Sequence, residues 1–83
     1  MEDAEKFIFK WLKKDTSKTL GRLRKHFKIG QETLARDLGL SYSTINAHEN
    51  GRNKPHKLIL REYSRYYAEK TFENSLDLSR ILH

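Results

Sequence analysis

Polar side chains that can read nucleic-acid bases gather between positions 42 and 47 of the sequence. A serine hydroxyl can bond several bases, an asparagine amide can form two hydrogen bonds to adenine, and an alanine methyl can contact the thymine methyl. A tyrosine can contact a base, a methyl group or a phosphate, and Thr44 has the sugar-phosphate backbone as its alternative partner. An ordinary solvated helix face is the competing interpretation. The candidate base contacts are Tyr42, Ser43, Thr44, Asn46 and Ala47.

A second group of side chains has the chemistry of phosphate contacts. Gln31 opens a short helical segment, where free backbone N–H groups favour a phosphate. The others flank the segment 42–47, and such contacts position a protein on DNA without reading its sequence. Arg52 and Lys54 have an alternative role, which is to keep a surface loop soluble without contacting DNA. The candidate phosphate contacts are Gln31, Ser41, Asn50, Arg52, Asn53 and Lys54.

The elements that must position these side chains are two short helices joined by a tight turn. Gly39 suits the turn because glycine adopts a positive φ without a Cβ penalty, and Ala35 is small enough for the two helices to approach closely. Ser41 can cap the second helix, and Asn50-Gly51 is typical of its end. The apolar residues that would set the crossing angle are Leu34, Leu38, Leu40 and Ile45. The pattern predicts a helix-turn-helix, whose second helix can enter a major groove.

Helical periodicity continues through the rest of the chain, and we predict an all-α fold. Residues 1–15 form an amphipathic helix that packs on the domain or dimerises, residues 16–69 form the helix-turn-helix domain, and residues 70–83 form a C-terminal helix that is a second candidate for dimerisation. Pro55 fits the first turn of a later helix, where its missing N–H costs little. The terminal apolar residues are Ala4, Phe7, Ile8, Trp11 and Leu12, then Phe72, Leu76, Leu78, Ile81 and Leu82.

The segment from Leu20 to Tyr67 carries several motifs in a fixed order and spacing. They are Leu23-Arg24, Gln31, Leu34-Ala35, Leu38-Gly39, Ser41, Ile45, Glu49-Asn50-Gly51 and Pro55. In these positions the sequence resembles the Cro and phage-repressor type of helix-turn-helix regulators (the lambda repressor-like or XRE family). The resemblance implies a compact bundle of four to five helices, here with an additional N-terminal helix, that binds duplex DNA as a dimer and regulates transcription.

The same resemblance implies two internal roles. Arg24 and Glu49 would form an ion pair that ties the first helix of the family domain to the end of the recognition helix. A guanidinium and a carboxylate can pair in bidentate fashion, which holds that geometry. Gln31 would brace Tyr42, the first side chain of the recognition helix. Two solvated surface charges are the alternative interpretation of the ion pair.

The sequence departs from the family pattern at three places. His48 stands where the family carries an apolar or aromatic side chain, so we expect partly polar packing beneath the recognition helix. Lys28 stands where the family has glycine. The turn after the fourth family helix is replaced by Ala68-Glu69-Lys70, which lets that helix run past Lys70.

The positive charge is concentrated in the middle of the chain. The 83 residues include 17 Lys and Arg, 11 Asp and Glu and no Cys, for a formal net charge of +6. Residues 1–15 are neutral, residues 16–61 have ten basic against three acidic side chains, and residues 62–83 are slightly acidic. The missing cysteines exclude disulfide frameworks and thiolate metal sites. With no apolar run near 20 residues and no basic leader, neither a membrane span nor a signal peptide is predicted.

These observations favour a DNA-binding regulator over an enzyme. No nucleophile–base pair, metal-ligand spacing or cofactor motif is recognisable, so we expect no catalysis, no metal and no cofactor. We expect a repressor that binds a near-palindromic operator as a homodimer in the cytoplasm of a bacterium, encoded by its genome, a phage or a plasmid. The alternative is an antitoxin-like module that binds a partner protein and its own promoter. RNA binding is disfavoured because no single-strand stacking pattern is present.

Overall fold

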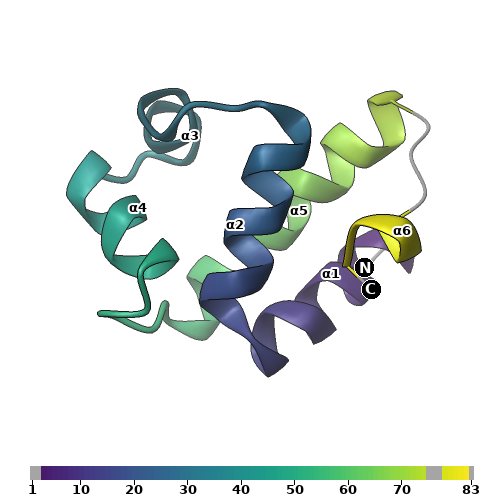
Figure 1. Cartoon of the computed structure of the whole chain (residues 1–83), viewed down its shortest axis with the longest axis horizontal. Helices are drawn as coiled ribbons and strands as arrows, with labels where there is room; N and C mark the ends of the chain where they lie inside the picture. Colours follow the sequence, from purple (N-terminus) through teal and green to yellow (C-terminus); the bar gives the residue numbers. More distant parts are fainter. Residues whose placement is uncertain (1–2, 75–77, 83) are drawn as a thin grey trace.

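The computed structural model describes residues 3–74 and 78–82, and all regular secondary structure within them is helical (Figure 1). The all-α prediction with an additional N-terminal helix is therefore confirmed. Within these residues no helix combines the length and apolar character needed to cross a membrane. The helices are α1 (Asp3–Lys14), α2 (Thr16–Phe27), α3 (Gln31–Leu38), α4 (Tyr42–Glu49), α5 (Lys57–Asn74) and α6 (Leu78–Leu82).

A residue with positive φ follows each of the helices α2, α3 and α4, directly after α2 and α3 and after the right-handed Asn50 in the case of α4. The φ angles are 56° at Lys28, 68° at Gly39 and 74° at Gly51. In each case the next N–H reaches back to a carbonyl of the last helical turn, as Leu40 N does to Ala35 O at 2.9 Å. This left-handed ending favours glycine, because a Cβ is strained there. Lys28 is thus the one of the three endings that carries this strain.

The junction between α1 and α2 is a break of one residue, Asp15, held by hydrogen bonds. The Asp15 side chain caps α2 by accepting from Lys18 N at 3.4 Å. The Thr16 hydroxyl donates to Leu12 O at 2.6 Å, and the Thr19 hydroxyl donates to Trp11 O at 3.3 Å. The last carbonyls of α1 are therefore satisfied by α2, which fixes the two helices relative to each other.

Helix α5 packs mainly against α1 and reaches α3 and α4 through single side-chain contacts. Its start differs from the prediction, because His56 occupies the cap position and accepts from Leu58 N at 3.2 Å, which leaves Pro55 two residues before the helix. On its side, the Tyr66 hydroxyl donates to Asp37 of α3 at 2.8 Å, and burial together with that bond raises the pKa of Tyr66 to about 12. The helix continues to Asn74 without a break at residues 69 and 70, as the missing turn had predicted.

The apolar stripes of both terminal segments contribute to the core of this chain. Ile8 and Leu12 of α1 are fully buried with α2 and α5, and Leu78 and Leu82 of α6 are buried beside α2. Phe72 is different, since 83% of its surface is exposed. Leu76, which the periodicity placed in the same C-terminal stripe, lies outside the described residues.

Candidate nucleic-acid interface

The recognition helix α4 turns one side to the core and another to solvent. Ile45 and His48 are buried, whereas Tyr42 and Ser43 are exposed and Asn46 is half-buried. The exposed side belongs to the first two turns, which is the part of a recognition helix that reaches base edges in this motif. Tyr42, Ser43 and Asn46 therefore lie in the first two turns of α4 with part or most of their surface accessible.

The N-terminus of α4 is capped by the predicted serine. Ser41 Oγ accepts from Thr44 N at 3.1 Å and lies 2.8 Å from Thr44 Oγ1 and 3.2 Å from Ser43 Oγ. The Thr44 hydroxyl is thus occupied within the cap, and this position is half-buried. The Ser43 hydroxyl lies farther from the Ser41 oxygen than the Thr44 hydroxyl does, and Ser43 is exposed.

Ala47 is the least exposed of the candidate base contacts. Its relative exposure is 9%, so most of this residue is already covered within the domain. The Ala47 carbonyl accepts from Arg52 N at 3.0 Å and from Asn53 N at 3.4 Å. These bonds engage the Ala47 carbonyl at the end of α4, and the base contact of Ala47 stays a prediction, with less exposed surface than at Tyr42 or Ser43.

Arg24 and Glu49 form the ion pair that the resemblance implied. Arg24 Nε lies 2.9 Å and 2.7 Å from the two carboxylate oxygens, so a single nitrogen bridges both oxygens instead of the two-nitrogen fork. The Nη1 group donates to Ile29 O at 3.1 Å and holds the loop between α2 and α3. The Glu49 side chain is only 7% exposed against 22% for Arg24, so its charge depends on this partner.

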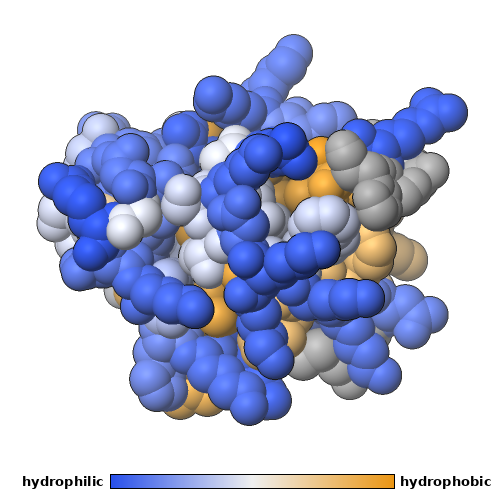
Figure 2. Space-filling view, turned by 60° about the horizontal axis from the view of Figure 1, so that its bottom comes forward, coloured by the Kyte–Doolittle hydropathy of each residue, from blue (hydrophilic) through white to orange (hydrophobic). Residues whose placement is uncertain are grey.

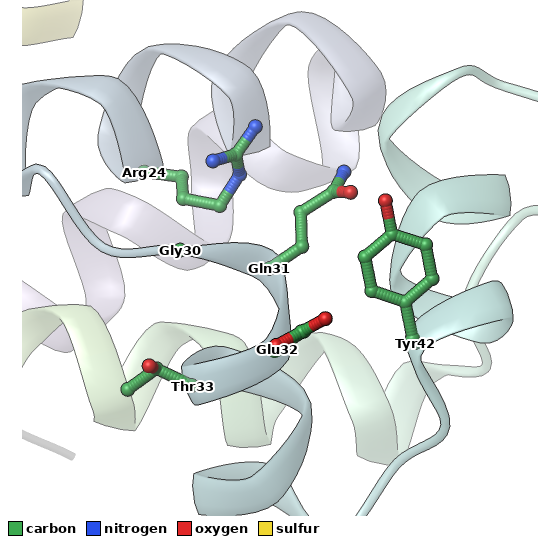
Figure 3. Close-up of a pocket in the computed structure, with 6 residues that line it drawn as sticks. All are labelled: Arg24, Gly30, Gln31, Glu32, Thr33 and Tyr42. Atoms are coloured by element: carbon green, nitrogen blue, oxygen red, sulfur yellow. The ribbon is translucent and has the colours of Figure 1, made fainter.

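Gln31 has different partners from the one expected. Its Nε2 donates to Glu49 Oε1 at 3.1 Å, and its Oε1 accepts from Asn46 Nδ2 at 3.4 Å. Among the described residues the hydrogen bonds recorded for Gln31 go to Glu49 and Asn46 and not to Tyr42, because the carboxylate and the amide of α4 lie within reach of its amide group. Gln31 and Tyr42 both line an open pocket between the start of α3 and the start of α4, and they border it from opposite sides (Figure 3).

Asn46 is the centre of a hydrogen-bond network on the exposed side of α4. Its Oδ1 accepts from Asn50 Nδ2 at 2.9 Å and from Arg52 Nη2 at 2.8 Å. Through Gln31 the network continues to Glu49 and Arg24. Two candidate phosphate contacts, Asn50 and Arg52, are thereby attached to a candidate base contact. The sequence did not indicate this connection.

The remaining phosphate candidates lie on the flanks of α4. Asn53 and Lys54 are exposed in the loop after the helix. On the other flank, Gly30 precedes α3 and supplies no side-chain cap to its first turn, where Gln31 begins the helix. Uncapped N–H groups at a helix start are suited to a phosphate.

His48 lies on the buried side of α4 and packs against Tyr63 of α5. Its Nδ1 lies 2.8 Å from the Tyr63 hydroxyl, and the two rings meet edge to face at 5.7 Å. Burial lowers the pKa of His48 below the ordinary value of 6.5. The predicted polar packing at this position is present, but the partner could not be read from the sequence.

Comparison with known proteins gives a single finding. A family model described as Helix-turn-helix matches residues 20–74, which is more than half of the chain. The chain belongs to the Cro/C1-type helix-turn-helix family. Searches of curated proteins and of solved structures find no match.

This helix-turn-helix protein therefore has the DNA-binding architecture of a regulator, with α3 and α4 as its two motif helices. Helix α1 precedes the matched segment and α6 follows it, so both are additions to the family core. Within residues 3–74 and 78–82, no group of three or more His, Asp or Glu side chains is arranged to hold a metal ion.

Proposed function

We propose that the protein binds duplex DNA sequence-specifically by inserting α4 into the major groove. The observation that carries this proposal is the exposed edge formed by Tyr42, Ser43 and Asn46 on a helix whose opposite side is fixed. Ile45 and the Arg24–Glu49 ion pair hold α4 against the domain. Side chains on rigid elements pay less ordering entropy on binding, which suits them to discriminate bases.

The phosphate-contacting part of the proposal uses both flanks of α4. Gln31 at the uncapped start of α3 would contact one strand, and the exposed loop after α4 would contact the other. The basic excess of residues 16–61 supports binding, because phosphate neutralisation supplies much of the affinity of such proteins. The proposed phosphate contacts are Gln31, Ser41, Asn50, Arg52, Asn53 and Lys54.

We further propose that the protein acts as a homodimeric repressor in the bacterial cytoplasm. Two copies on a near-palindromic operator would place their recognition helices about 34 Å apart. Because the terminal stripes are used inside the domain, Phe72 is the apolar side chain best available for self-association. Sedimentation of the wild type and of Phe72→Ser over a range of concentrations tests the dimer. A wild type that stays monomeric on its operator would contradict it.

Selection of bound sequences from a random duplex library tests the main proposal. We expect a consensus with two inverted half-sites one helical turn apart, bound at least 100-fold more tightly than a scrambled duplex of equal length. Structured RNA should compete poorly with the selected duplex. Equal affinity for selected and scrambled DNA would contradict sequence-specific binding.

The antitoxin-like function is a second candidate, favoured by the exposure of Phe72 and of Leu58 on α5. In that case these side chains would contact a different protein instead of a second copy. Light scattering on the purified protein separates the two: a stable dimer that protects Phe72 favours the homodimeric repressor, and a monomer favours the partner protein.

A further inference from the structure

The end of α1 and the loop after α4 border one shared hollow of about 270 Å³. We name it the junction hollow, since it lies where the α1–α2 junction meets that loop. Both segments lie at the lower edge of Figure 1, and Figure 2, which brings this side forward, shows it largely covered by hydrophilic side chains. The residues that line it are Lys13, Lys14, Asp15, Thr16, Ser17, His48, Gly51, Asn53 and Lys54.

The two sides of the junction hollow are in fixed positions. A Cβ added at Gly51 would lie 3.8 Å from Ser17 Cβ, so the chain just after α4 runs beside the start of α2. The hydrogen bonds from Thr16 and Thr19 to Leu12 and Trp11 hold the last turn of α1 against that start. The last turn of α1 is therefore held beside the loop that carries Asn53 and Lys54.

The junction hollow is strongly basic. Lys13, Lys14 and Lys54 line it with Asp15 as the single carboxylate, and Lys13 and Lys54 also line an adjoining hollow with Lys57. Within the described part of the chain, none of these four lysines lies within salt-bridge distance of a carboxylate. Lys14 Nζ lies 5.3 Å from the centre of the Trp11 ring, and Lys13 Nζ lies 5.5 Å from that of Phe9, and these cation–π contacts do not neutralise the two ammonium charges.

An ordinary helix C-terminus also favours basic residues, which would account for Lys13 and Lys14 by themselves. It does not account for Lys54 and Lys57, which come from a different part of the chain and face the same hollows. Four ammonium groups from three segments, with one carboxylate among them, form a surface that suits a polyanion.

We propose that Lys13 and Lys14 contact DNA backbone phosphates adjacent to those reached by Asn53 and Lys54. This inference rests on the proposed function, and it extends the DNA interface beyond the helix-turn-helix domain to a helix that precedes residue 20. The phosphates belong to the same duplex, because the lysines of α1 continue the surface of the loop that follows the recognition helix. Such contacts add affinity and register without reading bases.

The test compares two double variants that each remove two positive charges. Lys13→Gln/Lys14→Gln removes the proposed contacts, and Lys6→Gln/Arg80→Gln removes exposed charges on α1 and α6 that line neither hollow. Binding to the library-selected duplex is measured from about 50 to 200 mM salt, and circular dichroism verifies that each variant is folded. The logarithm of the association constant falls linearly with the logarithm of the salt concentration, and each lost phosphate contact makes this slope shallower by about 0.9.

We call Lys13→Gln/Lys14→Gln the junction variant and Lys6→Gln/Arg80→Gln the control variant. The magnitude of the salt slope should fall by nearly two for the junction variant and change little for the control variant. The advantage of the wild type over the junction variant should then shrink roughly tenfold across that salt range. Lys13→Arg/Lys14→Arg should retain the wild-type slope.

Equal slopes for the wild type and the junction variant, or equal losses in the two glutamine variants, would overturn the inference and leave the proposed function standing. A wild type that binds no duplex would overturn the proposed function itself, and the inference with it. The two failures are therefore distinguishable in one experiment.

Discussion

His48 Nδ1 lies 2.8 Å from the Tyr63 hydroxyl, and this contact joins the recognition helix to α5 inside the core. This buried position could be filled by an apolar side chain, and the histidine places a polar, titratable group there. The hydrogen bond satisfies both partners while the imidazole is neutral. The stability of the support beneath α4 is therefore linked to pH.

We expect the free energy of unfolding to decrease as the pH falls from 7 to 5. Burial lowers the pKa of His48 in the folded state, so the unfolded chain binds this proton more readily. The stabilisation is complete above the unfolded value of 6.5 and is lost as the pH falls through 6.5 toward the lowered folded pKa. Urea unfolding of wild type and His48→Leu at several pH values measures it. A variant with the same pH dependence as the wild type would contradict this assignment.

The Arg24–Glu49 pair should respond unequally to the loss of either partner. Arg24→Met leaves the buried Glu49 carboxylate with only Gln31, and we expect a loss of about 2–4 kcal/mol. Glu49→Gln leaves a guanidinium that is more exposed and can be hydrated, so the loss should be about 1–2 kcal/mol. Chemical denaturation of both variants checks the order, and the reverse order would show that Glu49 is not the dependent partner.

Lys28→Gly should stabilise the protein by about 0.5–1 kcal/mol. The φ of 56° at Lys28 is strained for a residue with a Cβ and free for glycine, and the gain is partly offset by the flexibility of glycine in the unfolded chain. Lys28→Ala is the matched control, because it removes the same charge and keeps the Cβ. Thermal denaturation should separate the two variants, and equal melting temperatures would contradict the strain.

Tyr63→Phe should destabilise the protein, whereas Tyr67→Phe should not. The Tyr67 hydroxyl is buried and finds no hydrogen-bond partner among the described residues, so its removal should be neutral or stabilise by up to about 1 kcal/mol. Removal of the Tyr63 hydroxyl leaves His48 Nδ1 unpaired and should destabilise by about 1–3 kcal/mol. Guanidinium denaturation compares the pair, and a destabilised Tyr67→Phe would indicate an unrecognised partner.

Ser43→Ala and Arg52→Ala should separate base reading from phosphate contact. We expect Ser43→Ala to cost about 1–3 kcal/mol on the selected duplex and little on a scrambled one. Arg52→Ala should weaken both complexes and lower the salt slope by about one. Ser43 is the cleaner probe, because a change at Asn46 also releases Arg52. Equal losses on both duplexes for Ser43→Ala would remove this residue from the base-contacting set.

Features governed by local spacing could be predicted from the sequence. The positive φ at Gly39 and the cap at Ser41 follow from rules that involve only a few neighbouring residues. The pairing of Arg24 with Glu49 came through the resemblance, since nothing local connects residues 25 positions apart. The all-α fold class followed from helical periodicity, which covers nearly the whole chain.

The features that the sequence did not predict depend on how distant segments meet. The low exposure of Ala47 depends on how α4 packs on the domain, and Gln31 pairs with Glu49 because α3 and α4 cross at a particular angle. The same holds for His48, whose position was recognised as unusual but whose partner lies on another helix. The sequence predicted that both terminal segments carry apolar stripes, but it left open whether these stripes pack on the domain or on a second copy. In the structure α1 and α6 bury them in the core of the same chain.

The network around Asn46 determines how a base would be read. In the free protein its Oδ1 accepts two hydrogen bonds and its Nδ2 donates one. Under the proposed function, an adenine edge must replace these bonds, so recognition becomes an exchange of partners with little net gain. A mismatched base would leave the amide, Asn50 or Arg52 unsatisfied, and the protein would discriminate by penalising wrong sites more than by rewarding the right one.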